Sequence, residues 1–152
     1  MSDKVAVVGI GNTLRRDDGI GIVVLEFLTK FHKKKGIDYF DFGSASFDLI
    51  NYIQSYDAVI LIDAIKADLP LGELKIAELD KIICFANTHV ESTHGFDLKN
   101  VFEICKTMEI KTKVFVAGIS VKDVSYGEKL STKLDVKVED IALEIDAFLE
   151  DF

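Results

Sequence analysis

Apolar runs alternate with short turn-forming segments along the 152-residue chain. A continuous β-branched run over residues 4–10 predicts a strand that is covered on both faces, as in a parallel sheet. Apolar residues at helical spacing then predict a helix over 20–30. The further expected elements are strands at 38–42, 58–62, 74–79 and 113–117, helices at 47–53, about 98–108 and 138–149, and an irregular segment at 84–95.

The alternation of strands and helices predicts an α/β fold, a three-layer α/β/α sandwich with helices on both faces of one sheet. Short loops and right-handed crossovers favour a twisted, mostly parallel (mixed) sheet of five strands. We expect the strand at 74–79, which alternates apolar and polar positions, to lie at the sheet edge. The length suits a single domain over 1–152.

Composition and charge exclude several classes of protein. Hydrophobic residues make up 49% of the chain, which excludes an intrinsically disordered protein. Asp and Glu number 26 against 18 Lys and Arg, and the resulting net charge of −8 argues against a nucleic-acid partner. No apolar stretch reaches the roughly 18 residues of a membrane span, and the first residues lack the features of a signal peptide. We therefore expect a cytoplasmic protein without a membrane partner.

The two cysteines, Cys84 and Cys105, do not form a known cysteine motif. They are separated by 21 positions, and no C-x-x-C spacing is present, which excludes a zinc knuckle and a thioredoxin-type site. Both lie among apolar neighbours, so we expect them to be small buried hydrophobic residues.

A glycine-rich segment joins the first strand to the first helix and reads Gly9-Ile-Gly-Asn-Thr-Leu-Arg-Arg-Asp-Asp-Gly-Ile-Gly21. It is not a dinucleotide-binding loop, because Leu14 stands where G-x-G-x-x-G requires its third glycine. Asp17 and Asp18 would also repel a pyrophosphate at the helix start. Peptidyl-tRNA hydrolases have a similar opening turn, but they need a histidine shortly downstream, where this chain has arginines and aspartates.

The segment instead resembles the opening motif of the hydrogenase maturation endopeptidases, which is a strand followed by G-x-G-N and D-[DE]-x-x-G. The fixed positions of that motif are present as Gly9, Gly11, Asn12, Asp17, Asp18 and Gly21. Many members of the family carry Glu where Asp18 stands. The resemblance continues in Val59-Ile-Leu-Ile-Asp63-Ala64, Ser92-Thr-His94, Ala117-Gly118-Ile119 and Leu130-Ser131, and so covers about residues 5–150.

The resemblance implies an endopeptidase that removes the C-terminal extension of a nickel–iron hydrogenase large-subunit precursor after nickel insertion. It implies that Asp18, Asp63 and His94 bind the metal and that the two aspartates are catalytic, which would make the enzyme an aspartyl-type protease. The nickel is expected to be supplied by the substrate and used for its recognition, and no organic cofactor is implied. An open site with few ligands can share a metal that the precursor already holds.

The residues themselves are compatible with this metal site. Asp18 and Asp63 each follow a predicted strand, and ligand sites in open α/β sheets lie beyond the carboxyl ends of the strands. His94, in a loop before a helix, can reach the same edge. Two carboxylates and one imidazole suit a divalent metal such as nickel or zinc and leave coordination positions open.

Each of these residues also has a purely structural interpretation when it is taken alone. Asp18 and Asp63 could cap a helix or form a turn, and His94 could be an ordinary loop histidine. The resemblance joins the three and favours the site. Asp17 is then expected to cap the first helix, and His89 is the competing metal ligand.

The chain contains only two arginines, Arg15 and Arg16, which are adjacent and lie in the segment that carries Asp18. Nothing in their local sequence suggests burial. They could form a solvated loop tip, or their guanidinium groups could bind carboxylates or carbonyl groups of the substrate beside the site.

Two rival functions stay open. The first is a non-catalytic metal-sensing checkpoint or chaperone that binds the hydrogenase precursor through the same ligands without cutting it. The second is a peptidase of this fold with another substrate. The residues do not decide which carboxylate, if either, acts as the general base.

Overall fold

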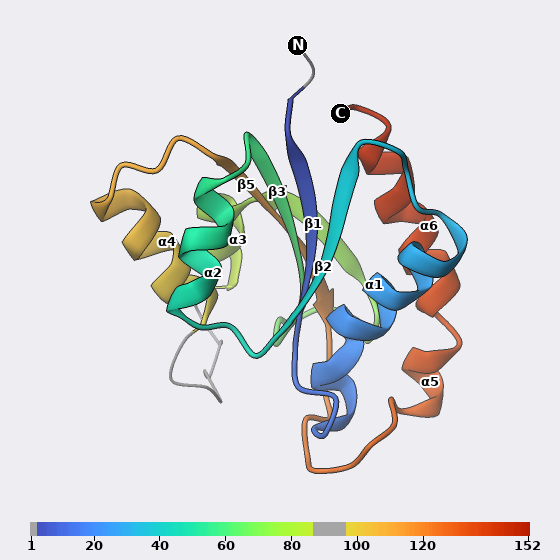
Figure 1. Ribbon diagram of the computed structural model, residues 1–152. Helices are drawn as coiled ribbons and strands as arrows, with labels where there is room; N and C mark the ends of the chain where they lie inside the picture. Colours follow the sequence, from blue (N-terminus) through green and yellow to red (C-terminus); the bar gives the residue numbers. More distant parts are fainter. Residues whose placement is uncertain (1–2, 87–96) are drawn as a thin grey trace.

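The computed structural model describes residues 3–86 and 97–152, and their strands form one sheet in the order β2-β1-β3-β5-β4 (Figure 1). The strands are β1 (Val5–Ile10), β2 (Ile37–Gly43), β3 (Ala58–Ile65), β4 (Leu74–Glu78) and β5 (Lys113–Ser120). The pairs β1–β2, β1–β3 and β3–β5 are parallel, whereas β4 runs antiparallel to β5 at the sheet edge. The predicted mostly parallel, mixed, five-stranded sheet and its edge strand are therefore confirmed.

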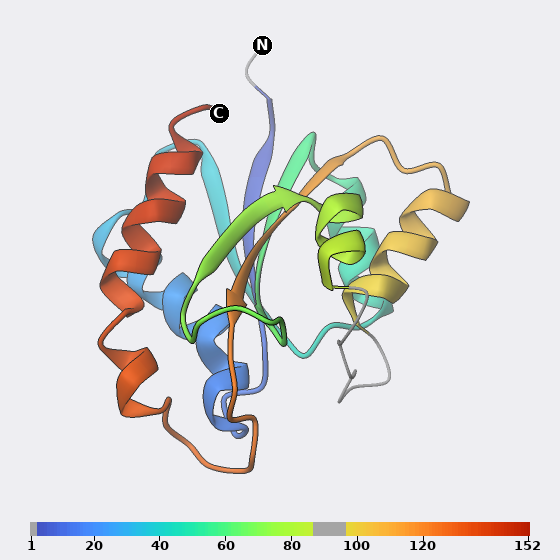
Figure 2. The ribbon, with the colours of Figure 1, turned by 180° about the vertical axis from the view of Figure 1, so that it is seen from behind.

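Helices cover both faces of this sheet, as Figures 1 and 2 show, and the predicted three-layer fold is confirmed. One face carries α1 (Ile20–Phe31), α5 (Thr132–Asp135) and α6 (Val138–Leu149). The other face carries α2 (Phe47–Gln54), α3 (Leu79–Ala86) and α4 (Leu98–Thr107). In the part of the chain that the structure describes, no helix is long and apolar enough to cross a membrane.

The continuous apolar run of β1 serves two hydrophobic cores at once. All six residues of the strand are buried, and successive side chains point to opposite faces of the sheet. Val5 and Val7 belong to the core under α1 and α6, whereas Ala6 and Val8 belong to the core under α2 and α4. Burial on both faces explains why this strand shows no alternation of apolar and polar residues.

Two local predictions were wrong around α3. The structure ends β4 at Glu78 and begins a helix at Leu79, where the sequence predicted the strand to continue and the chain to be irregular from residue 84. Leu79 and Ile82 lie one helical turn apart and are both buried. A short apolar run does not by itself distinguish a strand from a buried helix, because both bury such a run. The four-residue helix α5 was not predicted either.

The cysteines are less buried than their apolar neighbours suggested. Cys84 is exposed and Cys105 is half-buried, so the prediction of two buried cysteines is wrong for Cys84 and only partly correct for Cys105. Within α3 the core-facing position is taken by Ile82, and a residue two positions further along a helix points in a different direction.

Candidate functional site

Asp18 lies in a four-residue 3₁₀ helix, η1 (Arg16–Gly19), between β1 and α1. The residue is 9% exposed, and its Oδ2 accepts a hydrogen bond from the Asn12 N–H at 3.1 Å. Gly19, and not Asp18, occupies the N-cap position of α1. The helix-capping interpretation of Asp18 is therefore wrong, and the carboxylate is held at the carboxyl end of β1 instead.

Two glycines of the opening motif allow this segment to pack against the sheet. A side chain at Gly21 would collide with the carbonyl oxygens of Ile10 and Ile62, so the first turn of α1 lies directly on the ends of β1 and β3. A side chain at Gly11 would collide with the backbone carbonyl of Asp18. These close approaches, which only glycine permits, bring Asp18 towards the edge where β3 ends.

Asp63 reaches the same edge from within β3. The sequence placed it just past the strand, but β3 continues to Ile65 and Asp63 pairs with Gly118 of β5. Its pKa is raised well above the usual value, chiefly by burial and then by the negative charges of Asp18 and Asp97, although the Ala64 N–H lowers it. The residue as a whole is half-buried.

The structure therefore brings Asp18 and Asp63 together, close enough for one charge to disfavour ionisation of the other. Such a pair suits a divalent cation, whose positive charge would remove that repulsion. Within residues 3–86 and 97–152, no group of three or more His, Cys, Asp or Glu residues is arranged to hold a metal ion. The two histidines proposed as a third ligand, His94 and His89, lie outside the described residues.

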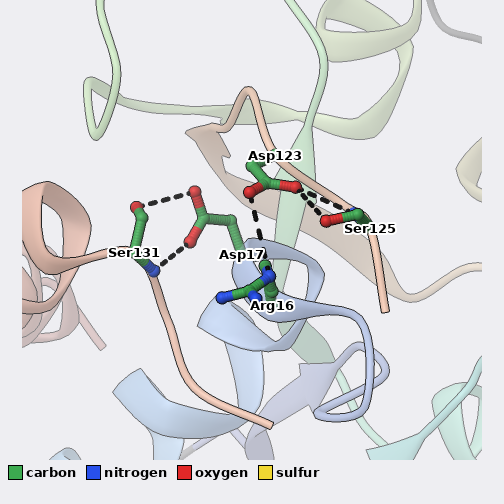
Figure 3. A network of polar contacts seen from close by, with 5 residues as sticks. All are labelled: Arg16, Asp17, Asp123, Ser125 and Ser131. Carbon is green, nitrogen blue, oxygen red and sulfur yellow. Dashed lines mark hydrogen bonds and ion pairs between the residues drawn. The ribbon is translucent and has the colours of Figure 1, made fainter. Parts of the chain in front are cut away.

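Asp17 does not occupy the N-cap position of the first helix, contrary to the sequence prediction. It is 1% exposed, and its carboxylate accepts two hydrogen bonds from Ser131, one from the backbone N–H at 2.7 Å and one from the hydroxyl at 2.9 Å (Figure 3). Ser131 belongs to the family-like Leu130-Ser131 pair in the sequence, but nothing in the local pattern indicated its partner. The adjacent aspartates thus contact different parts of the molecule.

Arg15 and Arg16 are both half-buried rather than forming a free loop tip. The Arg15 guanidinium carbon lies 5.8 Å from the centre of the Tyr126 ring, which suits a cation–π contact. Arg16 adopts a positive φ of 44°, and its Nε lies 3.9 Å from the nearer carboxylate oxygen of Asp123 (Figure 3). No local signal in the sequence marks the segment that carries Asp123 and Tyr126 as a partner of the arginines.

Comparison with known proteins gives this arrangement a family context. Residues 22–147 match a family model described as hydrogenase maturation protease. The hydrogenase expression/formation protein HupD of Bradyrhizobium diazoefficiens is 32% identical over 100 residues, which cover 65% of this chain and 52% of that protein. A putative hydrogenase maturation protease of Methanocaldococcus jannaschii is 26% identical, with 92% of this chain and 91% of that protein covered. The chain spans about half the length of the HupD and HupM relatives that it matches.

Solved structures share the fold. The hydrogenase maturating endopeptidase HybD of Escherichia coli superimposes with a TM-score of 0.84 at 21% identity, covering 97% of this chain and 93% of HybD. The nickel–iron hydrogenase maturation protease HycI of Thermococcus kodakarensis gives a TM-score of 0.76 at 24% identity, covering 98% and 94% of the two chains. The family-model match extends over most of the sequence, and this protein therefore belongs to the hydrogenase maturation protease family.

Proposed function

We propose that this protein is an endopeptidase that removes the C-terminal extension of a nickel–iron hydrogenase large-subunit precursor after nickel insertion. The observation that carries the proposal is the meeting of Asp18 and Asp63 at the carboxyl edge of the sheet, in a chain of the hydrogenase maturation protease family. Ligand and reaction sites of open α/β sheets lie at this edge.

The substrate in this proposal is a precursor that already carries nickel. Asp18, Asp63 and His94 would contact the ion and leave its other coordination positions to ligands from the precursor. Asp97 lies close enough to Asp63 for its charge to act on it, and His94 stands three residues earlier in the sequence. Nickel would neutralise the repulsion between the two carboxylates, and a bound metal can polarise a carbonyl group or a water molecule.

Asp18 and Asp63 are the catalytic residues of the proposal. Their carboxylates meet at the site and could receive a proton from an attacking water. This assignment corresponds to an aspartyl-type protease in which the same carboxylates also recognise the metal of the precursor.

Arg15 and Arg16 would bind the precursor beside the cleavage site. The Arg16 side chain is 43% exposed although it faces Asp123, and Tyr126 next to Arg15 is 84% exposed. A planar guanidinium can donate two parallel hydrogen bonds to a carboxylate or to backbone carbonyl groups. Arginine, tyrosine and the Asp18 segment thus offer a polar and aromatic surface for an extended peptide.

The test is incubation of the protein with nickel-loaded and with nickel-free precursor, followed by mass measurement of the large subunit. The proposal expects the mass to fall by that of the C-terminal extension only for the loaded precursor. The variant Asp63→Asn should leave the precursor intact, and Asp151→Asn, which changes an exposed aspartate near the end of the chain, is the matched control. A loaded precursor that binds but keeps its mass would identify a non-catalytic checkpoint instead.

A further inference from the structure

The segment that carries Asp18 is tied to the loop before α5 by a buried carboxylate. The Asp17 Oδ1 accepts a hydrogen bond from the Ser131 N–H at 2.7 Å, and its Oδ2 accepts one from the Ser131 hydroxyl at 2.9 Å (Figure 3). Both oxygens therefore bind one residue that lies 114 positions further along the chain. We call this pair of hydrogen bonds the Asp17–Ser131 clamp.

Backbone hydrogen bonds run beside the clamp and join the same two segments. The Arg16 N–H donates to the Gly127 carbonyl at 3.0 Å, and the Asp17 N–H donates to the Asp123 carbonyl at 3.1 Å. In the other direction, the Gly127 N–H donates to the Leu14 carbonyl at 2.9 Å. The loop that follows β5 thus holds the segment before α1 in position.

The clamp constrains Asp18 through the backbone. Asp17 and Asp18 are adjacent in the four-residue helix η1, so the position of one side chain restricts that of the other. If the segment moved away, the buried Asp17 carboxylate would lose both of its donors, which is strongly unfavourable for a charged group. The Asp18 carboxylate is in turn held by the Asn12 N–H at 3.1 Å.

We propose that Asp17 and Ser131 are positioning residues for the cleavage site, because their clamp holds the Asp18 carboxylate in place near Asp63. This inference rests on the proposed function, since it assigns the pair a part in the same reaction. Asp17 acts through Asp18 and does not itself bind substrate or metal. Of the two neighbouring aspartates, Asp17 holds the segment in position, and Asp18 supplies the negative charge at the site.

Four single variants distinguish the effect of the clamp hydrogen bonds from the effect of the negative charge of Asp17. Asp17→Asn keeps both contacts, because the amide oxygen can accept from the Ser131 N–H and the amide NH₂ can donate to the hydroxyl oxygen. Asp17→Ala removes both contacts. Ser131→Ala removes only the hydroxyl contact, and Ser131→Thr keeps it.

The kinetic expectation follows from these contacts. Asp17→Ala should lower kcat/KM for cleavage about 100-fold, the loss expected when a reacting group is displaced by about 1 Å. Ser131→Ala should lower it about fivefold, the effect of one hydrogen bond. Asp17→Asn and Ser131→Thr should stay within about threefold of the wild type, since their contacts are kept. The double variant Asp17→Ala/Ser131→Ala should lose no more than Asp17→Ala, because both changes remove the same bonds.

A second measurement reports the position of Asp18 without any precursor. The Asn12 amide donates to the Asp18 carboxylate, so its NMR shift and its protection from hydrogen exchange follow that carboxylate. Both should change in Asp17→Ala and stay unchanged in Asp17→Asn. Ser120→Ala is the matched control, because the buried Ser120 hydroxyl donates to the Leu69 carbonyl at 3.1 Å, away from the clamp.

Wild-type cleavage by a folded Asp17→Ala variant would overturn the inference, as would an Asn12 signal that changes equally in Ser120→Ala. If Asp17→Ala does not fold, Ser131→Ala decides, and an unchanged kcat/KM in that variant counts against the clamp. Failure of the wild-type protein to cleave any loaded precursor would refute the proposed function instead. In that case the Asn12 signal still shows whether the clamp positions Asp18.

Discussion

The two carboxylates of the candidate site approach each other from regions that are built in different ways. Asp63 belongs to β3, which pairs with β5 residue by residue from Ala58 to Ile65. Asp18 belongs to the irregular segment between β1 and α1, which is held by close glycine contacts and by the Asp17–Ser131 clamp. A continuous ladder fixes Asp63 through many equivalent hydrogen bonds, whereas the place of Asp18 depends on a few specific contacts.

This difference suggests that the two regions respond differently to mutation. When one hydrogen bond of a strand ladder is lost, the neighbouring hydrogen bonds still hold the strand in place. The position of Asp63 should therefore tolerate local changes well. Fewer contacts hold the Asp18 segment, so the loss of one contact should displace this segment before the whole protein unfolds. Mutations at the two regions should therefore differ in their effects on cleavage and on stability.

The largest effect is expected from removing either negative charge. Asp18→Asn and Asp63→Asn keep the size of the side chain but remove a carboxylate from the site, and each should lower precursor cleavage by at least about 100-fold. Folding should survive, because each change also removes charge repulsion between the two groups. The measurements are the rate of large-subunit mass loss and the circular dichroism spectrum. Wild-type cleavage by either variant would remove that aspartate from the site.

Asp18→Glu is the informative partner of these variants. It keeps the negative charge and adds one methylene group, and Glu is the residue that many family members carry at this position. We expect cleavage within about tenfold of the wild type, since the ligand chemistry is unchanged and only its reach differs. The same mass assay measures the effect, and a loss as large as that of Asp18→Asn would show that length matters more here than charge.

The next largest effect concerns the glycines of the Asp18 segment. Gly21→Ala should destabilise the fold by about 3 kcal/mol or more, because its new methyl group would meet two backbone carbonyls that cannot rotate away. Gly11→Ala should damage folding and cleavage together for the same reason. Chemical denaturation measures the free energy of unfolding. Gly36→Ala is the control: this glycine also has a positive φ, of 86°, but no neighbour within 4 Å, so it should lose only about 1 kcal/mol.

A smaller effect follows from the raised pKa of Asp63. Because the folded protein binds the Asp63 proton more tightly than the unfolded chain does, the stability of the fold should fall as pH rises from the ordinary Asp range through that raised pKa. Asp63→Asn cannot lose a proton, so it should unfold at a higher temperature than the wild type at neutral pH. The advantage should shrink towards pH ~4, where the carboxyl of the wild type is protonated.

Thermal unfolding across pH measures this difference, with Asp151→Asn as the control at an exposed position. An Asp63→Asn variant that is less stable than the wild type at neutral pH would contradict the expected repulsion. It would show that Asp63 has partners in the folded protein that stabilise its negative charge.

The smallest effect on stability is expected from the arginines. The Arg16–Asp123 contact is a partly exposed ion pair, so the double variant Arg15→Ala/Arg16→Ala should change the free energy of unfolding by only about 1 kcal/mol or less. If the pair binds the precursor, KM should rise and the defect should resemble that of added salt on the wild type. The control Arg15→Lys/Arg16→Lys keeps the charges and removes the planar groups. An unchanged KM would leave the arginines with a structural role alone.

Most of the fold was predictable because its determinants are local. Residues 5–10 have no polar side chain because β1 is buried on both faces, and the helix over 20–30 shows the spacing of one buried stripe. The limits appear at α3, where the short apolar run over residues 82–86 suits a strand or a helix equally well. There the choice depends on the core that the segment packs against.

The sequence predicted the two carboxylates of the candidate site, but it did not predict the contacts that hold Asp18 in position. The order of glycines and aspartates in the opening motif identified Asp18, and the strand that leads into Asp63 identified the second carboxylate. Asp17 was assigned to a helix cap because capping is the usual role of an aspartate before a helix. Its actual partner, Ser131, is 114 positions away, and no local sequence pattern can indicate a partner so distant in the chain.

The sequence by itself determined which segments are buried, which turns require glycine and which acidic residues lie near the end of a strand or in the segment that follows it. These properties depend on a residue and its close neighbours along the chain. Only the tertiary structure decided that Asp18 acts on the charge of Asp63, that Ser131 binds Asp17 and that β4 pairs with β5 in the antiparallel direction. Those features arise from contacts between segments that are distant in sequence, because packing the helices on the sheet fixes which loops meet at its carboxyl edge.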